Sequence, residues 1–217
     1  MIVVSLIAGV LVLLYLIIML RLRGALLKTP LSRTAEWDQD DPPAVSIIIP
    51  ARDEEENLNA CLKSLKQLTY PDSRLEIILV NDRSTDTTPE LMRTFQDNNP
   101  GVTIVDISTL PHQRTGKINA LLAGMDKAGG DYLFFTDADC RVPPRWIEAT
   151  LARYTPDTGM VAGGIITTMS PVVPQWISDC QSLEWLFFCT AAEACAILGR
   201  PQSVFGNNLS LRRSVST

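Results

Sequence analysis

The sequence from residue 45 to residue 50 is Val-Ser-Ile-Ile-Ile-Pro, and residues 75–80 read Leu-Glu-Ile-Ile-Leu-Val. Both are nearly continuous apolar runs, a pattern typical of strands that are buried on both faces. Between them, residues 53–67 predict a helix whose apolar face carries Leu58, Cys61, Leu62 and Leu65. A strand, a helix and a second buried strand in this order predict a β-α-β unit and therefore a parallel sheet.

The same alternation continues along the chain. Further strands are predicted at 102–107, 132–136, 158–169 and after Asn208, and further helices at 86–98, 116–128, 144–154 and 175–198. The predicted fold class is α/β, with a Rossmann-like, mostly parallel sheet and helices on both faces. In such sheets ligands bind beyond the carboxyl ends of the strands, so the functional residues are expected there.

An uncharged apolar run opens the chain and predicts one transmembrane helix at residues 1–22. Twenty helical residues span about 30 Å, the thickness of the hydrocarbon core of a bilayer. The alternative is a buried core helix, which usually shows a polar face. Residues 23–43, with three prolines, are predicted as a juxtamembrane linker, and residues 44–217 as the α/β domain.

The charges are unevenly distributed along the chain. Residues 1–33 hold four of the 19 basic side chains and no acidic one, so all 24 acids lie in the remainder. Because the basic residues follow the apolar run, the positive-inside rule predicts a single membrane pass with the domain in the cytoplasm. A domain this acidic is a poor candidate for binding nucleic acid. The five cysteines, an odd number without a Cys-x-x-Cys pair, indicate reduced thiols.

Two acids of an Asp-x-Asp motif, Asp137 and Asp139, follow the apolar strand at 132–136. In an extended chain, residues i and i+2 point to the same side, so both carboxylates face one volume. Two like charges are costly there without a cation, and oxygen ligands suit Mg²⁺ or Mn²⁺. The alternative is a solvated turn that happens to contain two acids.

Another acid, Asp82, stands where the strand at 75–80 ends. Its carboxylate can accept hydrogen bonds from a nucleobase N–H or a ribose hydroxyl. The alternative is an Asx turn closed by Ser84 and Thr85, with Asp86 capping the next helix. We assign Asp82 to a ligand and Asp86 to the cap.

The acidic run at 53–56 is explained mainly by the dipole of the predicted helix, although Glu54 is expected to face the ligand edge. Gly116 and Lys117 open another predicted helix, where free N–H groups and a lysine favour an anionic ligand. The alternative for Lys117 is a solvated lysine. The phosphate loop of P-loop NTPases is absent because Ile118 follows Lys117, and no Gly-x-Gly-x-x-Gly follows the first strand.

Five segments of the chain, in this order and spacing, resemble the family 2 glycosyltransferases, which have the GT-A fold. These segments are 49–55, 80–86, 116–121, 137–139 and 206–208. The resemblance covers residues 45–213 and is closest to membrane-anchored bacterial members that use nucleotide-sugar donors on the cytoplasmic face. It implies inverting transfer of a sugar from a nucleotide-diphosphate sugar, with UDP-sugar favoured, to a hydroxyl of a glycan or lipid-linked acceptor in cell-envelope polysaccharide synthesis.

The resemblance also implies roles for individual residues. The donor-binding residues would be Ala51, Arg52, Glu54, Asp82, Lys117 and Asp137. Asp137 would contact the ribose or the metal, and Asp139 would hold the Mg²⁺ or Mn²⁺ that bridges the diphosphate. The acceptor side would carry Asn207, Asn208 and Arg212.

The sequence departs from the family pattern at the catalytic base, an Asp in a Glu-Asp pair that follows the Gly-Asn-Asn segment. No such pair occurs up to Thr217, so no base is assigned and we expect it beyond Thr217. The alternative function is a membrane-tethered nucleotide-sugar-binding fragment without turnover. A sugar nucleotidyltransferase would need a glycine-rich loop after the first strand, where the sequence has Ala51-Arg52-Asp53.

The predicted helix at 175–198 has two possible locations. Its aromatic side chains, among them Trp176, Phe187 and Phe188, would suit a membrane surface. We favour the alternative, that it packs on the sheet or against C-terminal segments expected beyond Thr217.

Overall fold

The computed structural model describes residues 2–27, 40–108, 116–166, 173–200 and 206–215. Contacts within the chain divide it into two compact units. One unit comprises residues 1–33 and 164–204, and the other comprises residues 34–163 and 205–217. The second unit contains the sheet and the candidate site.

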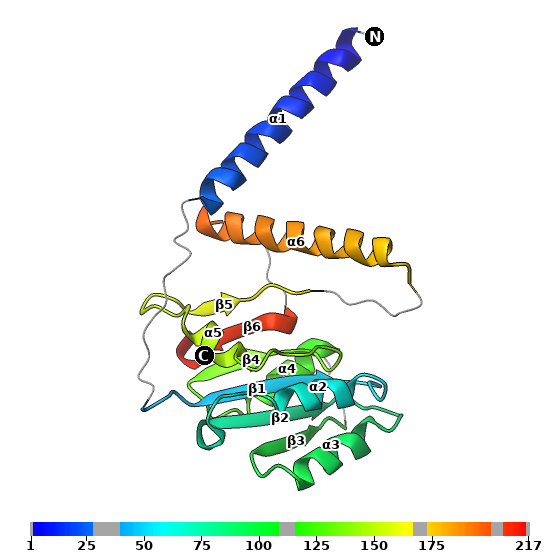
Figure 1. The fold of residues 1–217 in the computed structure, drawn as a ribbon, viewed down its shortest axis with the longest axis vertical. Coiled ribbons are helices and arrows are strands. Elements are labelled where there is room, and N and C mark those ends of the chain that lie inside the picture. The colour runs from blue at the N-terminus through cyan, green and yellow to red at the C-terminus, as the bar shows by residue number, and fades with distance from the viewer. Residues whose placement is uncertain (1, 28–39, 109–115, 167–172, 201–205, 216–217) are drawn as a thin grey trace. The chain divides into compact units, whose positions relative to one another are not determined.

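Six strands form one sheet in the order β3-β2-β1-β4-β6-β5 (Figure 1). The strands are β1 Val45–Ala51, β2 Leu75–Asn81, β3 Val102–Asp106, β4 Tyr132–Phe135, β5 Met160–Ala162 and β6 Leu209–Arg212. Strands β1 to β4 run parallel to one another, whereas β6 runs antiparallel to both β4 and β5. The sheet is therefore mostly parallel, as the sequence predicts.

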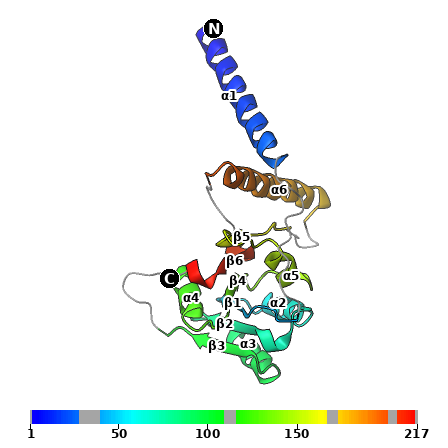
Figure 2. The same cartoon turned by 90° about the vertical axis from the view of Figure 1, so that its left-hand side faces the viewer.

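Helices cover both faces of this sheet (Figure 2). They are α2 Leu58–Leu65, α3 Thr88–Asp97, α4 Lys117–Met125 and α5 Trp146–Leu151. The pleat of β1 sends Ile47 and Ile49 to the side of α2, α3 and α5, and sends Ile48 to the side of α4. All three isoleucines are fully buried.

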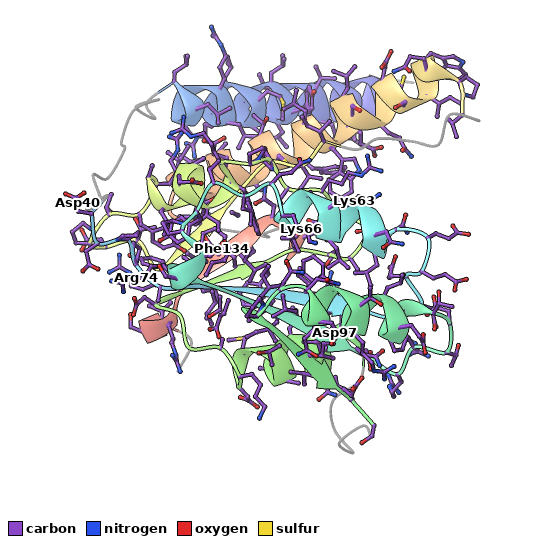
Figure 3. All side chains as sticks on the ribbon, turned by 60° about the horizontal axis from the view of Figure 1, so that its bottom comes forward. Asp40, Lys63, Lys66, Arg74, Asp97 and Phe134 are labelled. Carbon is purple, nitrogen blue, oxygen red and sulfur yellow. The ribbon has the colours of Figure 1, made fainter. Side chains whose placement is uncertain are left out.

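The larger of the two cores lies between the sheet and helices α2, α3 and α5. Phe134 of β4 is buried there, and its ring meets the edge of Trp146 with the ring centroids 5.1 Å apart. Figure 3 shows Phe134 among packed side chains, while Lys63 on α2 and Asp97 on α3 lie at the surface. Such aromatic pairs and their buried area hold α5 against the strand that precedes Asp137.

The structure corrects one predicted helix. The helix expected at 53–67 begins only at Leu58, because residues 52–57 form a loop in which Asp53 has a φ of 53°. The acids of this loop therefore do not form a first helical turn. The expected strand at 158–169 is reduced to β5, and its last residues, 167–169, lie outside the described residues.

The other unit contains α1 Ile2–Leu26 and α6 Gln175–Ile197. Among the described helices, α1 is the one that is long and apolar enough to cross a membrane, by length and composition. It continues past the predicted boundary at residue 22. Residues 28–39 of the predicted linker lie outside the described residues, and the predicted division into domains stays a prediction.

Helix α6 is exposed along most of its length. Its only buried residue is Ala194, and its exposed apolar side chains are Trp176, Leu183, Leu186, Phe187, Phe188 and Ile197. The contacts within the chain group α6 with α1 and not with the sheet.

Candidate functional site

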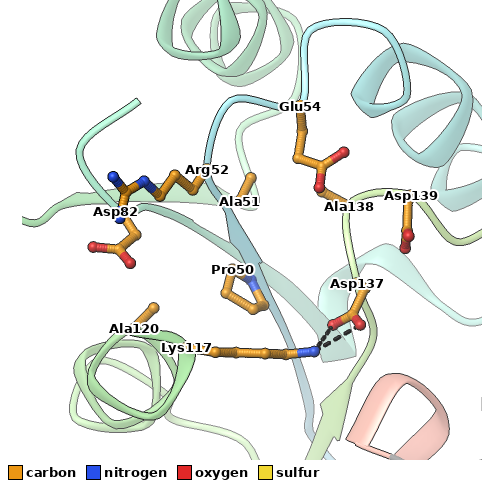
Figure 4. A pocket seen from close by; sticks show the side chains of 10 residues that line it. All are labelled: Pro50, Ala51, Arg52, Glu54, Asp82, Lys117, Ala120, Asp137, Ala138 and Asp139. Carbon is orange, nitrogen blue, oxygen red and sulfur yellow. Dashed lines mark hydrogen bonds and ion pairs between the residues drawn. The ribbon is translucent and has the colours of Figure 1, made fainter. Parts of the chain in front are cut away.

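A pocket of about 200 Å³ opens beyond the carboxyl ends of β1, β2 and β4 (Figure 4). It is lined by Pro50, Ala51, Arg52, Glu54, Asp82, Lys117, Ala120, Asp137, Ala138 and Asp139. Every residue predicted to bind the donor or the metal is in this set. The structure brings these residues together, and their individual roles stay predictions.

The location of the pocket follows from the sheet. Neighbouring parallel strands end at the same edge, so the residues after β1, β2 and β4 meet there. The backbone N–H of Asp82 donates to the carbonyl of Ala51 at 2.9 Å and so ties the first residue after β2 to β1. In Figure 4, Arg52 and Asp82 lie on one side of the pocket, and Asp137 and Asp139 lie on the other.

Lys117 and Asp137 form an ion pair inside the pocket. The ammonium nitrogen Nζ lies 2.5 Å from Oδ1 and 2.6 Å from Oδ2 of Asp137. Lys117 is the first residue of α4, and the preceding Gly116 has a φ of 70°, a conformation that glycine adopts without strain. Lys117 therefore belongs to the pocket and is not simply a solvated lysine.

Asp139 is exposed, and its Oδ1 lies 3.4 Å from the thiol of Cys140. Burial, and next the negative charge of Asp139, raise the pKa of the Cys140 thiol to about 11. Burial also raises the pKa of the nearby Cys61 thiol to about 12, and this thiol lies 3.6 Å from the carbonyl oxygen of Asp137. Both thiols are thus neutral at pH 7 and act as weak donors beside the acidic segment.

The pocket suits a divalent cation that is shared with a ligand. Within the described residues, no group of three or more His, Cys, Asp or Glu side chains forms a complete metal cage. Asp137 and Asp139 offer carboxylate oxygens to the same pocket. Mg²⁺ and Mn²⁺ are commonly bound by one or two carboxylates together with phosphate oxygens and water, and these residues fit that arrangement.

Asp82 lies on the opposite side of the pocket with its side chain 6% exposed. Its Oδ1 accepts a hydrogen bond from Nε of Arg83 at 2.8 Å, a partner that the sequence analysis missed although it is the next residue. The turn predicted here is made by Asn81, whose Oδ1 accepts from the N–H of Ser84 at 3.0 Å. Asp82 is thus free of the turn and faces the pocket.

Asp86, the predicted cap of α3, lies one residue before the N-cap position, which is occupied by Thr87. Oδ1 of Asp86 accepts from the N–H of Thr88, the first residue of α3, at 2.9 Å. Desolvation would raise the pKa of Asp86, but the hydrogen bonds from Thr88 and Glu55 outweigh it and lower that pKa.

The residues predicted for the acceptor side are separated in the structure. Nδ2 of Asn207 lies 3.8 Å from Sγ of Cys140, beside the Asp-x-Asp segment. Asn208 instead accepts from the indole N–H of Trp146 at 2.9 Å. Neither residue lines the pocket.

Arg212 lies at the other end of β4, because it pairs with Tyr132 in the sheet, and its guanidinium donates to the carbonyl of Thr155 at 2.9 Å. We therefore withdraw Arg212 from the acceptor side.

The sequence profile of Glycosyl transferase family 2 matches residues 46–215. The chain belongs to glycosyl transferase family 2. The match includes all six strands except the first residue of β1, every segment that lines the pocket, and helix α6.

Curated relatives agree with this family. A probable glycosyltransferase of Bacillus subtilis, YdaM, is 39% identical over 97 residues, which cover 45% of this chain and 23% of the relative. The undecaprenyl-phosphate 4-deoxy-4-formamido-L-arabinose transferase of Serratia proteamaculans is 36% identical over 107 residues, which cover 48% of this chain and 31% of that enzyme. This chain thus matches less than a third of the length of either relative.

Solved structures of other glycosyltransferases share the fold. The mannosyltransferase PcManGT of Pyrobaculum calidifontis, solved in complex with GDP-Man and Mn²⁺, superposes with a TM-score of 0.70 at 22% identity over 91% of this chain and 52% of that one. The glucosyl-3-phosphoglycerate synthase of M. tuberculosis gives a TM-score of 0.52 at 19% identity over 80% of this chain and 58% of that one. The predicted GT-A fold of this family 2 glycosyltransferase is confirmed.

Proposed function

We propose that this glycosyltransferase domain binds a nucleotide-diphosphate sugar in its pocket and transfers the sugar, with inversion, to a hydroxyl acceptor. The observation that carries the proposal is the joint presence of Asp137, Asp139 and Lys117 in one pocket at the strand ends. Carboxylates that can share a cation and a lysine that can meet phosphate oxygens together suit a diphosphate. The solved mannosyltransferase of the same fold, whose complex contains GDP-Man and Mn²⁺, supports this interpretation.

We assign the diphosphate of the donor to the side of the pocket that carries Asp137 and Asp139. Asp139 offers an exposed carboxylate to Mg²⁺ or Mn²⁺, and Lys117 forms an ion pair with Asp137 beside it. The bound cation would supply positive charge that neutralises the departing diphosphate. Lys117 would add a second positive charge beside the same phosphates.

The nucleoside end is assigned to the side of Arg52 and Asp82. Oδ1 of Asp82 accepts from Nε of Arg83, and the carboxylate keeps lone pairs that can accept a hydrogen bond from a base, such as the N3–H of uracil. We therefore propose a UDP-sugar as the donor.

The acceptor is proposed to be a glycan or a lipid-linked molecule at the membrane surface. Helix α1 would anchor the protein in the inner membrane, with the domain in the cytoplasm because Arg21 and Arg23 lie at the end of the apolar run. The name of the Serratia relative includes undecaprenyl phosphate, a lipid-linked acceptor. Asn207, beside Cys140, is the residue kept on the acceptor side. We assign no general base among the described residues.

Calorimetric titration with UDP and GDP, each with and without Mn²⁺, tests the donor site. We expect Mn²⁺-dependent binding of UDP, and Asp139→Asn should weaken it at least about tenfold because a cation ligand is lost. Asp157→Asn is the matched control, since Asp157 is exposed and does not line the pocket. Unchanged affinity in Asp139→Asn would remove the metal assignment, and tighter binding of GDP would overturn the choice of base.

Turnover is tested separately, by measuring UDP released from a UDP-sugar in the presence of a polyprenyl-linked glycan, whose hydroxyls can accept the sugar. Release supports the transferase. Saturable binding without any release would instead support the alternative function, a nucleotide-sugar-binding module.

A further inference from the structure

The two loops that carry Arg52 and Asp82 are joined by hydrogen bonds. One loop follows β1 at residues 52–57, and the other follows β2 and reaches α3 at residues 82–88. Three consecutive backbone N–H groups of the first loop donate to side chains of the second. Asp53 N donates to Ser84 Oγ at 3.1 Å, Glu54 N to Thr88 Oγ1 at 2.8 Å, and Glu55 N to Asp86 Oδ2 at 3.0 Å.

The second loop returns the same kind of contact. Oδ1 of Asp53 accepts from both the N–H and the hydroxyl of Thr85, at 2.7 and 3.2 Å. Oε2 of Glu55 accepts from both the N–H and the hydroxyl of Thr87, at 3.1 and 2.8 Å. Side chains and backbone groups of each loop are thus held by the other loop.

The side chains of the first loop alternate in direction. Arg52 and Glu54 line the pocket, whereas Asp53 and Glu55 bond to the second loop. The residues that face the ligand are therefore flanked by residues that fix the backbone. Asp53 has a positive φ, which Asp tolerates better than most residues, and its hydrogen bonds hold it in that conformation.

We propose that Asp53 and Glu55 are positioning residues for the nucleoside, because they lock the two loops together and so hold Arg52 and Asp82 at the pocket before the ligand arrives. The proposal rests on the nucleotide-binding function proposed above. Loops that are already ordered lose less entropy when the ligand binds, so the lock should strengthen nucleotide affinity.

The geometry predicts that these two carboxylates act as hydrogen-bond acceptors and not through their charge. Each uses one oxygen for both donors of a threonine, and an amide side chain offers one such oxygen too. Asn at 53 and Gln at 55 should therefore keep the lock, whereas Ala should break it. Oδ2 of Asp53 lies 3.8 Å from Nε of Arg52, but both side chains are about half exposed to solvent, so this ion pair adds little to the stability of the loop.

The experiment compares two double variants of the full chain, Asp53→Ala with Glu55→Ala, and Asp53→Asn with Glu55→Gln. Calorimetry measures the affinity for UDP and for pyrophosphate, both with Mn²⁺. We expect the Ala pair to bind UDP at least about tenfold more weakly and pyrophosphate nearly as the wild type does, because Asp137, Asp139 and Lys117 lie on other elements. The amide pair should bind UDP within about threefold of the wild type.

Equal weakening in the two pairs would overturn the proposal, because the charge would then be what matters. Wild-type UDP affinity in the Ala pair, or equal loss of UDP and pyrophosphate binding, would also overturn it. If the Ala pair does not fold, the single variants Glu55→Ala and Glu55→Gln are compared instead. Glu55→Ala should then behave as predicted for the Ala pair, and Glu55→Gln as predicted for the amide pair.

Hydrogen exchange tests the lock without any nucleotide. The backbone amides of Thr85 and Thr87 should exchange faster in the Ala pair and at the wild-type rate in the amide pair. Unchanged exchange in the Ala pair would overturn the lock. A wild-type chain in which the amides of Thr85 and Thr87 exchange more slowly than in the Ala pair, but which binds no nucleotide, would instead contradict the proposed function.

Discussion

At the scale of single residues, Lys117 neutralises part of the acidic charge of the pocket. It holds both oxygens of Asp137 while Asp139 stays exposed. The other basic side chain that lines the pocket is Arg52, which Figure 4 shows on the opposite side. A diphosphate that enters between these groups thus meets one nearby ammonium group.

Lys117→Met is expected to weaken UDP binding at least about tenfold, because a charge-assisted contact to the phosphates is lost and Asp137 is left without its partner. Affinity for uridine, which has no phosphate, should change little. Titration calorimetry with both ligands measures the difference. Lys127→Met removes the same charge from an exposed position outside the pocket and should leave both affinities unchanged. An equal loss for uridine and UDP would contradict this role of Lys117.

Asp82, Asp137 and Asp139 could be predicted because they stand directly after apolar strands, where a parallel sheet collects them, and Lys117 because it opens a helix. Ala51 and Arg52 were implied by the family resemblance. The sequence did not identify the pairing of Lys117 with Asp137. These residues are 20 positions apart, and their contact depends on how α4 packs on the sheet. Arg212 was misplaced for the same reason, since only the antiparallel register of β6 shows which end of β4 it reaches.

At the scale of elements, a group of hydrogen bonds around Glu76 connects the ends of β1 and β2 that lie opposite the pocket with the turn before β4. Glu76 of β2 accepts from the hydroxyl of Ser46 of β1, and from the N–H groups of Gly129 at 2.5 Å and Gly130 at 3.1 Å. Gly130 also donates to Ser46 Oγ at 2.8 Å. The turn before β4 is thereby fixed against β1 and β2, and with it the strand that ends before Asp137.

Gly130→Ala should destabilise the fold, because an added Cβ would lie 2.6 Å from the backbone nitrogen of Ser46. We expect a loss of about 2 kcal/mol, and a melting temperature lower by about 5 °C. Gly129→Ala is the control, since its Cβ would meet Glu76 at an ordinary 3.5 Å. Equal melting temperatures for the two variants, measured by circular dichroism, would show that the turn can shift without cost.

Strands β1 to β4 could be predicted because each is a short apolar run, and α3 and α4 because polar residues and glycine mark their starts. The helix at 53–67 was predicted too long, since acids before an apolar helical pattern usually form its first turn. Here Asp53 and Glu55 instead accept hydrogen bonds from Thr85 and Thr87. A single sequence does not show such a long-range partner, so the local pattern was misleading.

At the scale of the whole molecule, the family 2 match at residues 46–215 includes both the sheet and α6, although the contacts within the chain group α6 with α1. Apolar side chains cover α1, as expected of a helix that crosses a membrane. The family and the GT-A fold followed from five segments in one order. The donor, the acceptor and the membrane location are proposals.

The central claim is that the pocket binds a cation and a nucleoside diphosphate together. Electron paramagnetic resonance of free Mn²⁺ tests this claim most directly, because the signal of the aqueous ion falls when protein binds it. With Asp137 held by Lys117, and no complete metal cage among the described residues, the chain alone should leave the Mn²⁺ signal nearly unchanged. Adding UDP should reduce the signal well below that of an Mn²⁺–UDP mixture without protein. A signal that UDP reduces equally with and without the chain would contradict the account.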